Sequence, residues 1–477
     1  MDFDDKWINE IFALERKGLI NEALARAKEY TIQFPKNHMS FFILGMIYHS
    51  LQKFDLAIRA YDRSIKANQL FADCYAEKAN SLISLGQYEK AIDCLQKAIA
   101  IDGNYAEAHY NLGRSYSALA CNDLAIEAFK QAIKLKDFPL ARLALSDTLR
   151  LKGQFGEALS CISSLLKELP NFPDIFFIQG NIFSDMHHYR DAIFSYEKAI
   201  QLNINFLEAY IALTRVYRAM GRLDDAIKYI NYAISLDPDV AKLYVFRAEV
   251  YLEMQLLDQA RANYLTAFEL TKEINTAYAL CSLLLSMEQY QSADEVKIKF
   301  SSQDPEGINT SLIEGIICSG KQKYEQAISN FKKFLKNNKD NVIALTQLGI
   351  AYANLDLYND ARKIFYNILE RDPQSAEALS NLGALFSEEA DLDQAIEYCE
   401  RAIMIQPKLA GAYYTKACAF LRKGEYIKGW EAFEWRKKIH LSNQVFFKEE
   451  KIPDNVKDLV NKKVLFVWEQ GLGDTIQ

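Results

Sequence analysis

An alanine returns at a nearly constant interval along most of this 477-residue chain. Successive members of the series are 34 residues apart, or 33 at two of the steps, and a further step of 34 reaches Gly429. A period of this length is typical of a stack of similar supersecondary units, each of which buries its apolar face against its neighbours. A single globular core does not produce such a series. Its members are Ala23, Ala57, Ala91, Ala125, Ala158, Ala192, Ala226, Ala260, Ala293, Ala327, Ala361 and Ala395.

Other positions of the repeat follow the same period when this alanine is counted as position 20. Position 8 is small in eleven repeats, position 24 is often aromatic, position 15 is glycine in five repeats, and position 32 takes six of the nine prolines. Positions 20, 24 and 27 share one helical face, and small residues at 8 and 20 allow two helices to approach closely. Glycine suits the left-handed residue that closes the first helix, and proline ends the second. Each repeat is therefore predicted to be a pair of antiparallel helices.

This pattern resembles the tetratricopeptide repeat over about residues 4 to 440. The resemblance implies an all-α fold, a right-handed superhelical solenoid of about thirteen helical hairpins. Repeats 1 and 9 depart from the pattern, with Ile11 at position 8 and Lys297 at position 24, and we interpret repeat 9 as a drifted copy rather than a soft joint. The repeats are expected to begin near Asp4, His38, Ala72, Ala106, Pro139, Pro173, Leu207, Ala241, Ile274, Ile308, Val342, Ala376 and Ala410.

Composition limits the partners of this chain. Hydrophobic residues make up 50% and charged residues 25%, as in a folded protein, and the net charge of −7 argues against nucleic acid. The N-terminal sequence lacks a basic-then-apolar signal, and no apolar run approaches the roughly 18 residues of a membrane helix, so no membrane partner is expected. The eight cysteines are dispersed, with no CxxC pair. We therefore expect reduced thiols in a cytoplasmic protein without a metal site.

The first helices of stacked tetratricopeptide repeats line a concave surface. Position 9 of these helices is polar or charged from repeat 3 to repeat 8, whereas residues such as Met46 and Ile350 occupy it outside that stretch. This row favours binding of a protein or an extended peptide in the concave groove. The predicted groove residues are Asn80, Arg114, Asp147, Asn181, Arg215 and Glu249, with Asn111 at position 6.

A second interpretation needs no ligand. Arg114 with Asp147, and Arg215 with Glu249, would form ion pairs between neighbouring first helices, each contributing only about 0–1 kcal/mol if exposed. Both interpretations stay open on the sequence alone. The asparagine ladder at position 6 that is typical of arms resembling the O-GlcNAc transferase arm is incomplete. Position 6 carries asparagine only at Asn9, Asn111 and Asn381, and a dicarboxylate clamp for a chaperone tail lacks its cations at Ala76, Leu140 and Ala144.

The repeat pattern breaks near the C-terminus. A Gly429-Trp430 pair and a Trp435-Arg436 pair precede a polar stretch, and the apolar run Val464–Val467 then leads into a turn that contains Gly473 and Asp474. Four apolar residues bounded by a lysine and a glycine-rich turn predict a buried strand. A strand followed by such a turn is typical of the start of an α/β domain, where a helix N-terminus can hold an anionic or polar ligand.

This C-terminal segment resembles bacterial proteins in which a tetratricopeptide arm leads into a glycosyltransferase of the GT-B type. The resemblance divides the chain into a solenoid (1–440), a linker (441–461) and the first strand and glycine-rich loop of a truncated catalytic domain (462–477). In related, heptosyltransferase-like enzymes the aspartate of this loop is a proposed general base, which implies Asp474 here. A nucleotide-sugar donor is implied for the complete parent enzyme, and this chain alone is expected to have no cofactor and no transferase activity.

The resulting prediction is a protein- or peptide-binding scaffold that serves as the recognition arm of a larger glycosyltransferase. The alternative is a stand-alone adaptor with no catalytic function. A homodimer through the end repeats is a further candidate for the partner.

Overall fold

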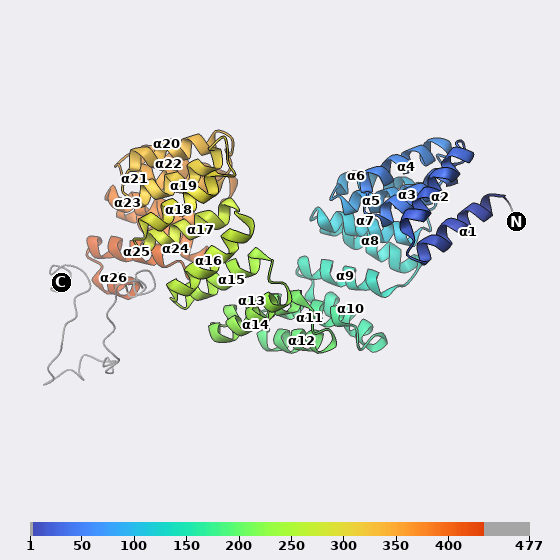
Figure 1. Ribbon diagram of the computed structural model, residues 1–477. Coiled ribbons are helices and arrows are strands. Elements are labelled where there is room, and N and C mark those ends of the chain that lie inside the picture. Colours follow the sequence, from blue (N-terminus) through green and yellow to red (C-terminus); the bar gives the residue numbers. More distant parts are fainter. Residues whose placement is uncertain (1–2, 434–477) are drawn as a thin grey trace. The chain divides into compact units, whose positions relative to one another are not determined.

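The computed structural model describes residues 3–433, and within this range it contains 26 helices and no strand. The chain divides into two compact units, residues 1–236 and residues 237–477, which we call the N-terminal and C-terminal units. In each unit, consecutive helices pack against one another in chain order (Figure 1). The predicted all-α fold is therefore confirmed. The predicted linker (441–461), the strand and loop (462–477) and Asp474 lie outside the described residues.

The N-terminal unit contains seven helical hairpins. Its helices are α1 (Phe3–Arg16), α2 (Ile20–Gln33), α3 (His38–Ser50), α4 (Phe54–Ala67), α5 (Ala72–Ser84), α6 (Tyr88–Ile101), α7 (Ala106–Ala118), α8 (Asn122–Leu135), α9 (Pro139–Leu151), α10 (Phe155–Glu168), α11 (Pro173–Asp185), α12 (Tyr189–Leu202), α13 (Leu207–Ala219) and α14 (Leu223–Leu236).

The C-terminal unit contains six more hairpins. Twelve of the thirteen first helices in the chain begin at the predicted residue, and α1 begins one residue before Asp4. The helices of this unit are α15 (Ala241–Glu253), α16 (Leu257–Thr271), α17 (Ile274–Ser286), α18 (Tyr290–Ser301), α19 (Ile308–Gly320), α20 (Tyr324–Leu335), α21 (Val342–Ala353), α22 (Tyr358–Arg371), α23 (Ala376–Glu388), α24 (Leu392–Ile405), α25 (Ala410–Lys423) and α26 (Tyr426–Phe433).

The periodic alanines form the inner seam of the hairpins. All twelve are fully buried, at 0% exposure, and Gly429 continues the buried series on α26. A larger side chain at this position would separate the helices of a close-packed interior. In repeat 5 the Ser146 hydroxyl donates to the Ala158 carbonyl at 3.0 Å, so positions 8 and 20 face each other as the spacing predicts.

A glycine and an aromatic ring interlock inside several hairpins. A Cβ atom built on Gly180 would lie 2.5 Å from Cε1 of Tyr196, which is 2% exposed. In such a hairpin the residue at position 8 is therefore glycine because the ring at position 24 lies on its backbone. This glycine–ring contact recurs in the pairs Gly45–Tyr61, Gly113–Phe129, Gly315–Phe331 and Gly349–Phe365.

Position 15 adopts a left-handed backbone in every repeat. The φ angles at this position lie between 57° and 86° for all thirteen residues, of which only five are glycine. Residues such as Ala120 and Gln255 take this conformation although it costs an L-residue about 1–2 kcal/mol. The turn geometry is therefore imposed by the packing of the hairpin, and glycine is favoured there without being required.

The glycine–ring contact predicts a strong response to a single methyl group. Gly180→Ala is expected to destabilise the N-terminal unit by about 1–3 kcal/mol, because the new Cβ would overlap the ring of Tyr196. Gly156 on α10 is a matched control, since nothing lies within 4 Å of its Cβ position. Urea denaturation followed by circular dichroism measures both effects. Equal midpoints for Gly180→Ala and Gly156→Ala would contradict the assignment, and Gly180→Ala combined with Tyr196→Leu should recover part of the loss.

Candidate protein-binding surface

The predicted groove residues of the N-terminal unit lie in one row across neighbouring first helices. Consecutive members of the set α5, α7, α9, α11 and α13 contact each other, and each carries one row residue at position 9. Arg114 and Arg215 are exposed, and the other three are partly exposed. We call this set the position-9 row: Asn80, Arg114, Asp147, Asn181 and Arg215. Glu249 is partly exposed on α15, in the C-terminal unit.

Three predicted groove residues form a continuous hydrogen-bonded chain on α5 and α7. The Asn80 amide donates to Oε2 of Glu77 at 3.3 Å, and the Asn111 amide donates to Oδ1 of Asn80 at 2.9 Å. Nη1 of Arg114 donates to Oδ1 of Asn111 at 3.2 Å. This chain holds the Arg114 side chain in place while engaging one of the five N–H donors of its guanidinium. Among residues 3–433 no ion pair of Arg114 is recorded.

Asp147 forms an ion pair with Arg150, a partner that was not predicted from the sequence. Nε of Arg150 donates to Oδ1 of Asp147 at 2.8 Å, and Nη1 of Arg150 donates to Oδ2 of Asp185 on α11 at 2.5 Å. The recorded pairing thus differs from the suggested pair of Arg114 with Asp147. Burial opposes the charge of Arg150, but the hydrogen bonds to the two carboxylates raise its pKa on balance. Arg150 lies three residues after Asp147, which is the helical spacing that could have indicated it.

Asn181 accepts a hydrogen bond from the aromatic residue of its own hairpin. The Tyr196 hydroxyl donates to Oδ1 of Asn181 at 2.8 Å, and burial raises the pKa of Tyr196 well above its ordinary value. Arg215 on α13 is exposed, and its positive charge opposes part of the rise in the pKa of Tyr196 that burial causes. The row therefore combines three residues held by internal hydrogen bonds with two exposed guanidinium groups, of which Arg114 also bonds to Asn111.

The apolar continuation of position 9 in the C-terminal unit is partly covered by the protein itself. Ile316 is 4% exposed and Leu312 is 2% exposed on the first helix α19. The Gln347 amide on α21 donates to the Tyr278 hydroxyl on α17 at 3.1 Å, a bond between the two first helices that flank α19. Ile316 and its neighbour Leu312 are therefore packed inside the unit, whereas Ile350 and Ala384, at position 9 of the later repeats, are partly exposed.

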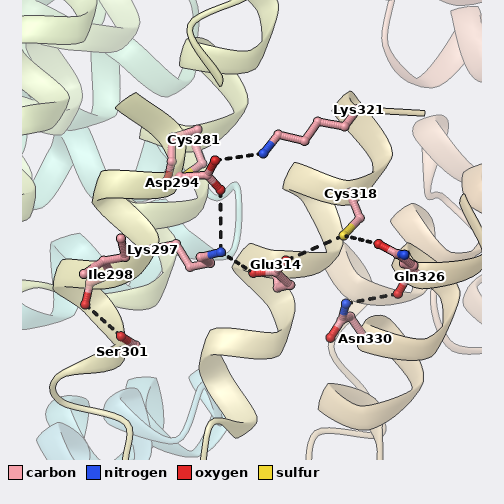
Figure 2. A network of polar contacts seen from close by, with 11 residues as sticks. Cys281, Asp294, Lys297, Ile298, Ser301, Glu314, Cys318, Lys321, Gln326 and Asn330 are labelled. Atoms are coloured by element: carbon pink, nitrogen blue, oxygen red, sulfur yellow. Dashed lines mark hydrogen bonds and ion pairs between the residues drawn. The ribbon is translucent and has the colours of Figure 1, made fainter. Parts of the chain in front are cut away.

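Repeat 9 replaces the glycine–ring contact with a cluster of charges (Figure 2). Nζ of Lys297, at position 24, lies 2.7 Å from Oε2 of Glu314 and 3.5 Å from Oδ1 of Asp294. Nζ of Lys321 lies 2.8 Å from Oδ2 of Asp294, and the Cys318 thiol contacts Oε1 of Glu314 at 3.7 Å. These contacts connect α18 on one side with α19 and the turn after it on the other. In repeat 9, ion pairs therefore form at the position that an aromatic side chain occupies in several other repeats.

Within residues 3–433 no three histidine, cysteine, aspartate or glutamate side chains come together in a way that could hold a metal ion. In the same range, no helix has both the length and the apolar character needed to cross a membrane.

Known repeat families match segments in both units. Models described as tetratricopeptide repeat or TPR repeat match residues 13–70, 79–119, 106–138, 320–374 and 376–409. A model described as anaphase-promoting complex, cyclosome, subunit 3 matches residues 185–267. The chain therefore carries tetratricopeptide repeats and is a scaffold of the protein-binding type.

Individual relatives match only parts of the chain. Over 101 residues this chain is 30% identical to anaphase-promoting complex subunit 3 of Schizosaccharomyces pombe, and the matched stretch is 21% of this chain and 15% of that protein. A second match, over 132 residues at 30% identity, is to the probable UDP-N-acetylglucosamine–peptide N-acetylglucosaminyltransferase SPINDLY of Hordeum vulgare. This stretch is 26% of this chain and 14% of that protein. The crystal structure of yeast Tom70 is 14% identical, covers 92% of this chain and 100% of its own, and has a TM-score of 0.45.

The charge cluster of repeat 9 predicts a pH-dependent stability. The Lys321 hydrogen bond, supported by Lys297, lowers the pKa of Asp294 below its ordinary value of 3.8. A lowered pKa in the folded state stabilises the fold above the unfolded-state value, and this contribution disappears as the pH falls through the folded-state pKa. Lys321→Met is expected to cost about 0–1 kcal/mol at pH 7, because both side chains are about one-third exposed, and to cost less at pH 3.

Urea midpoints measured from pH 7 to pH 3 test this prediction. Lys339→Met is the control, because it removes one exposed positive charge from a loop of the same unit. A loss for Lys321→Met that is the same at pH 3 as at pH 7, or that equals the loss in the control, would contradict the assigned pairing.

Proposed function

We propose that this chain is the recognition arm of a larger glycosyltransferase and that an extended segment of a partner protein lies along the position-9 row. The proposal rests on the exposure of the Arg114 and Arg215 guanidinium groups in a row of side chains that internal hydrogen bonds hold in place, Arg114 among them. Exposed guanidinium groups offer several donors for the carbonyl or carboxylate oxygens of a partner.

The spacing expected for the row suits an extended peptide. Neighbouring packed helices lie about 8–10 Å apart, and an extended chain advances about 3.3 Å per residue, so about three partner residues correspond to one repeat. The hydrogen-bonded chain from Glu77 to Arg114 holds these side chains before a partner arrives. Groups that are already ordered lose less conformational entropy on binding, which favours affinity.

The transferase part of the proposal is supported by two likenesses. The barley relative SPINDLY is named as a peptide N-acetylglucosaminyltransferase, and 26% of this chain matches it. The segment from Gly429 to Gln477 resembles the junction between a tetratricopeptide arm and a GT-B domain. In this proposal the nucleotide-sugar donor binds to the catalytic domain of the parent enzyme, in the cytoplasm. Asp474 would act there as the general base toward the acceptor hydroxyl.

A stand-alone adaptor is the second candidate. The match of residues 185–267 to a model of anaphase-promoting complex subunit 3 supports it, because that protein is named as a subunit of an assembly. The partner would then be another protein, or a second copy of this chain bound through the end repeats. Reading the coding DNA beyond Gln477 separates the two candidates: an open frame that encodes alternating strands and helices favours the transferase, and an immediate stop codon favours the adaptor.

The two exposed arginines provide a direct binding test. A photo-crosslinking residue at position 114 or 215 of the full chain would capture the partner. Replacing both arginines with alanine should then weaken binding of the purified partner about tenfold or more, because charge-assisted hydrogen bonds are lost. Biolayer interferometry measures the affinity. Replacing all the predicted groove residues with alanine should abolish binding of the partner.

The matched control removes the same charge from second helices. Arg63 on α4 and Arg190 on α12 are exposed, and their joint replacement by alanine should leave the affinity unchanged. Equal affinities for the Arg114/Arg215 variant and the control variant would contradict the proposed binding row.

A further inference from the structure

The C-terminal unit contains a cavity of about 390 Å³ that is open to the surface between the first helices α21 and α23. Its apolar floor includes Ile350 and Ala353 from α21 and Ala384 and Leu385 from α23, and the ring of Phe365 on α22 also lines it. Phe365 is 1% exposed and lies on the backbone of Gly349, so the glycine–ring contact of repeat 11 supports the floor from below. The cavity is therefore built on a fixed part of the fold.

The polar rim of this cavity offers mainly hydrogen-bond acceptors. The Tyr358 hydroxyl donates to Oδ1 of Asp356 at 2.7 Å, and the Asn354 amide nitrogen donates to the Ile350 carbonyl at 2.9 Å. These bonds use the Tyr358 hydroxyl and one N–H of Asn354, and they leave Oδ2 of Asp356 and Oδ1 of Asn354 as acceptors. The second N–H of Asn354 and the amide of Asn381, which also lines the cavity, are the remaining donors. Glu388, the last residue of α23, is exposed and adds a second carboxylate. Among residues 3–433 no ion pair of Glu388 is recorded.

Three cations on α22 and α25 are bound by other acceptors. Arg362 on α22 pairs with Glu389, Arg422 on α25 donates to the Ser387 carbonyl, and Lys423 pairs with Asp393. Because a carbonyl is neutral, Arg422 keeps its positive charge beside Ser387, the residue before Glu388, and so balances the two rim carboxylates only in part. The hydrogen bond to Asp356, together with the charges of Asp356, Glu388 and Glu389, raises the pKa of Tyr358.

We propose that this cavity holds an arginine side chain of a partner protein. The methylene groups of the arginine would cover Ile350 and Ala384, as long basic side chains do on apolar surfaces. Its planar guanidinium would lie at the rim, where five donors meet the acceptors of Asp356, Asn354 and Glu388. The ring of Tyr358 offers a face for cation–π contact, and an acidic side chain would be repelled by the two carboxylates. This site is separate from the position-9 row, so either can fail without the other.

Binding of a small arginine probe tests the proposal on the full chain. The chain is labelled with ¹³C at isoleucine methyl groups and titrated with N-acetyl-arginine-N-methylamide. The Ile350 methyl signal, assigned with Ile350→Val, should shift in a saturable manner. The neutral citrulline analogue should bind several-fold more weakly. Asp356→Asn and Glu388→Gln should each weaken arginine binding about two- to fivefold, the range of an exposed ion pair.

Controls are built into the same spectra. Glu370→Gln removes an exposed carboxylate from α22 outside the cavity and should not change the affinity. The methyl signal of the buried Ile316 in the same unit shows whether each variant is folded. The proposal is overturned if Ile350 does not respond, if the citrulline analogue binds equally well, or if both carboxylate variants bind like the wild type. A lysine analogue that binds as tightly as arginine would overturn the assignment to arginine.

Discussion

In five of the thirteen hairpins a glycine on the first helix packs directly against an aromatic ring on the second. In the pair Gly180–Tyr196 the ring lies where a side chain on the glycine would have to be. The same ring donates its hydroxyl proton to Asn181, one residue further along the first helix. Packing inside a hairpin and the position of a candidate binding residue are therefore coupled through a single side chain. The cavity above Phe365 depends on the same contact in repeat 11.

The two units use their first helices differently. In the N-terminal unit the first helices display polar side chains that are connected by hydrogen bonds, with Arg114 and Arg215 exposed. In the C-terminal unit Gln347 on α21 bonds to Tyr278 on α17, and Ile316 is buried on α19, the first helix between these two. The same repeat thus yields a polar binding row in one unit and, in the other, a covered apolar helix followed by an acidic cavity.

Local sequence predicted the hairpins well because their signals recur with the repeat. The alanine period fixed the start of nearly every first helix, and the five glycines at position 15 all have left-handed backbones. Position 15 is also left-handed at Ala120 and seven other residues that are not glycine, because the hairpin imposes the turn. Propensity alone would not have indicated a left-handed alanine.

The partners of the site residues were harder to predict, since they depend on which side chains meet across helices. Arg150 pairs with Asp147 and Asp185 although the sequence interpretation offered Arg114 as the partner. The bond from Gln347 to Tyr278 joins residues that are two repeats apart, and no local pattern indicates it. The position-9 row itself follows from the period, whereas binding of a peptide along it stays a prediction.

The central claim is that a partner protein lies extended along the position-9 row. The most direct measurement is to crosslink the partner from position 114 and, separately, from position 215, and to locate both sites by mass spectrometry. The two positions are three first helices apart, which corresponds to about eight residues of extended chain. We expect two crosslinks about eight residues apart in one continuous partner segment. Crosslinks that scatter over unrelated parts of the partner, or that form equally well from position 190 on α12, would contradict it.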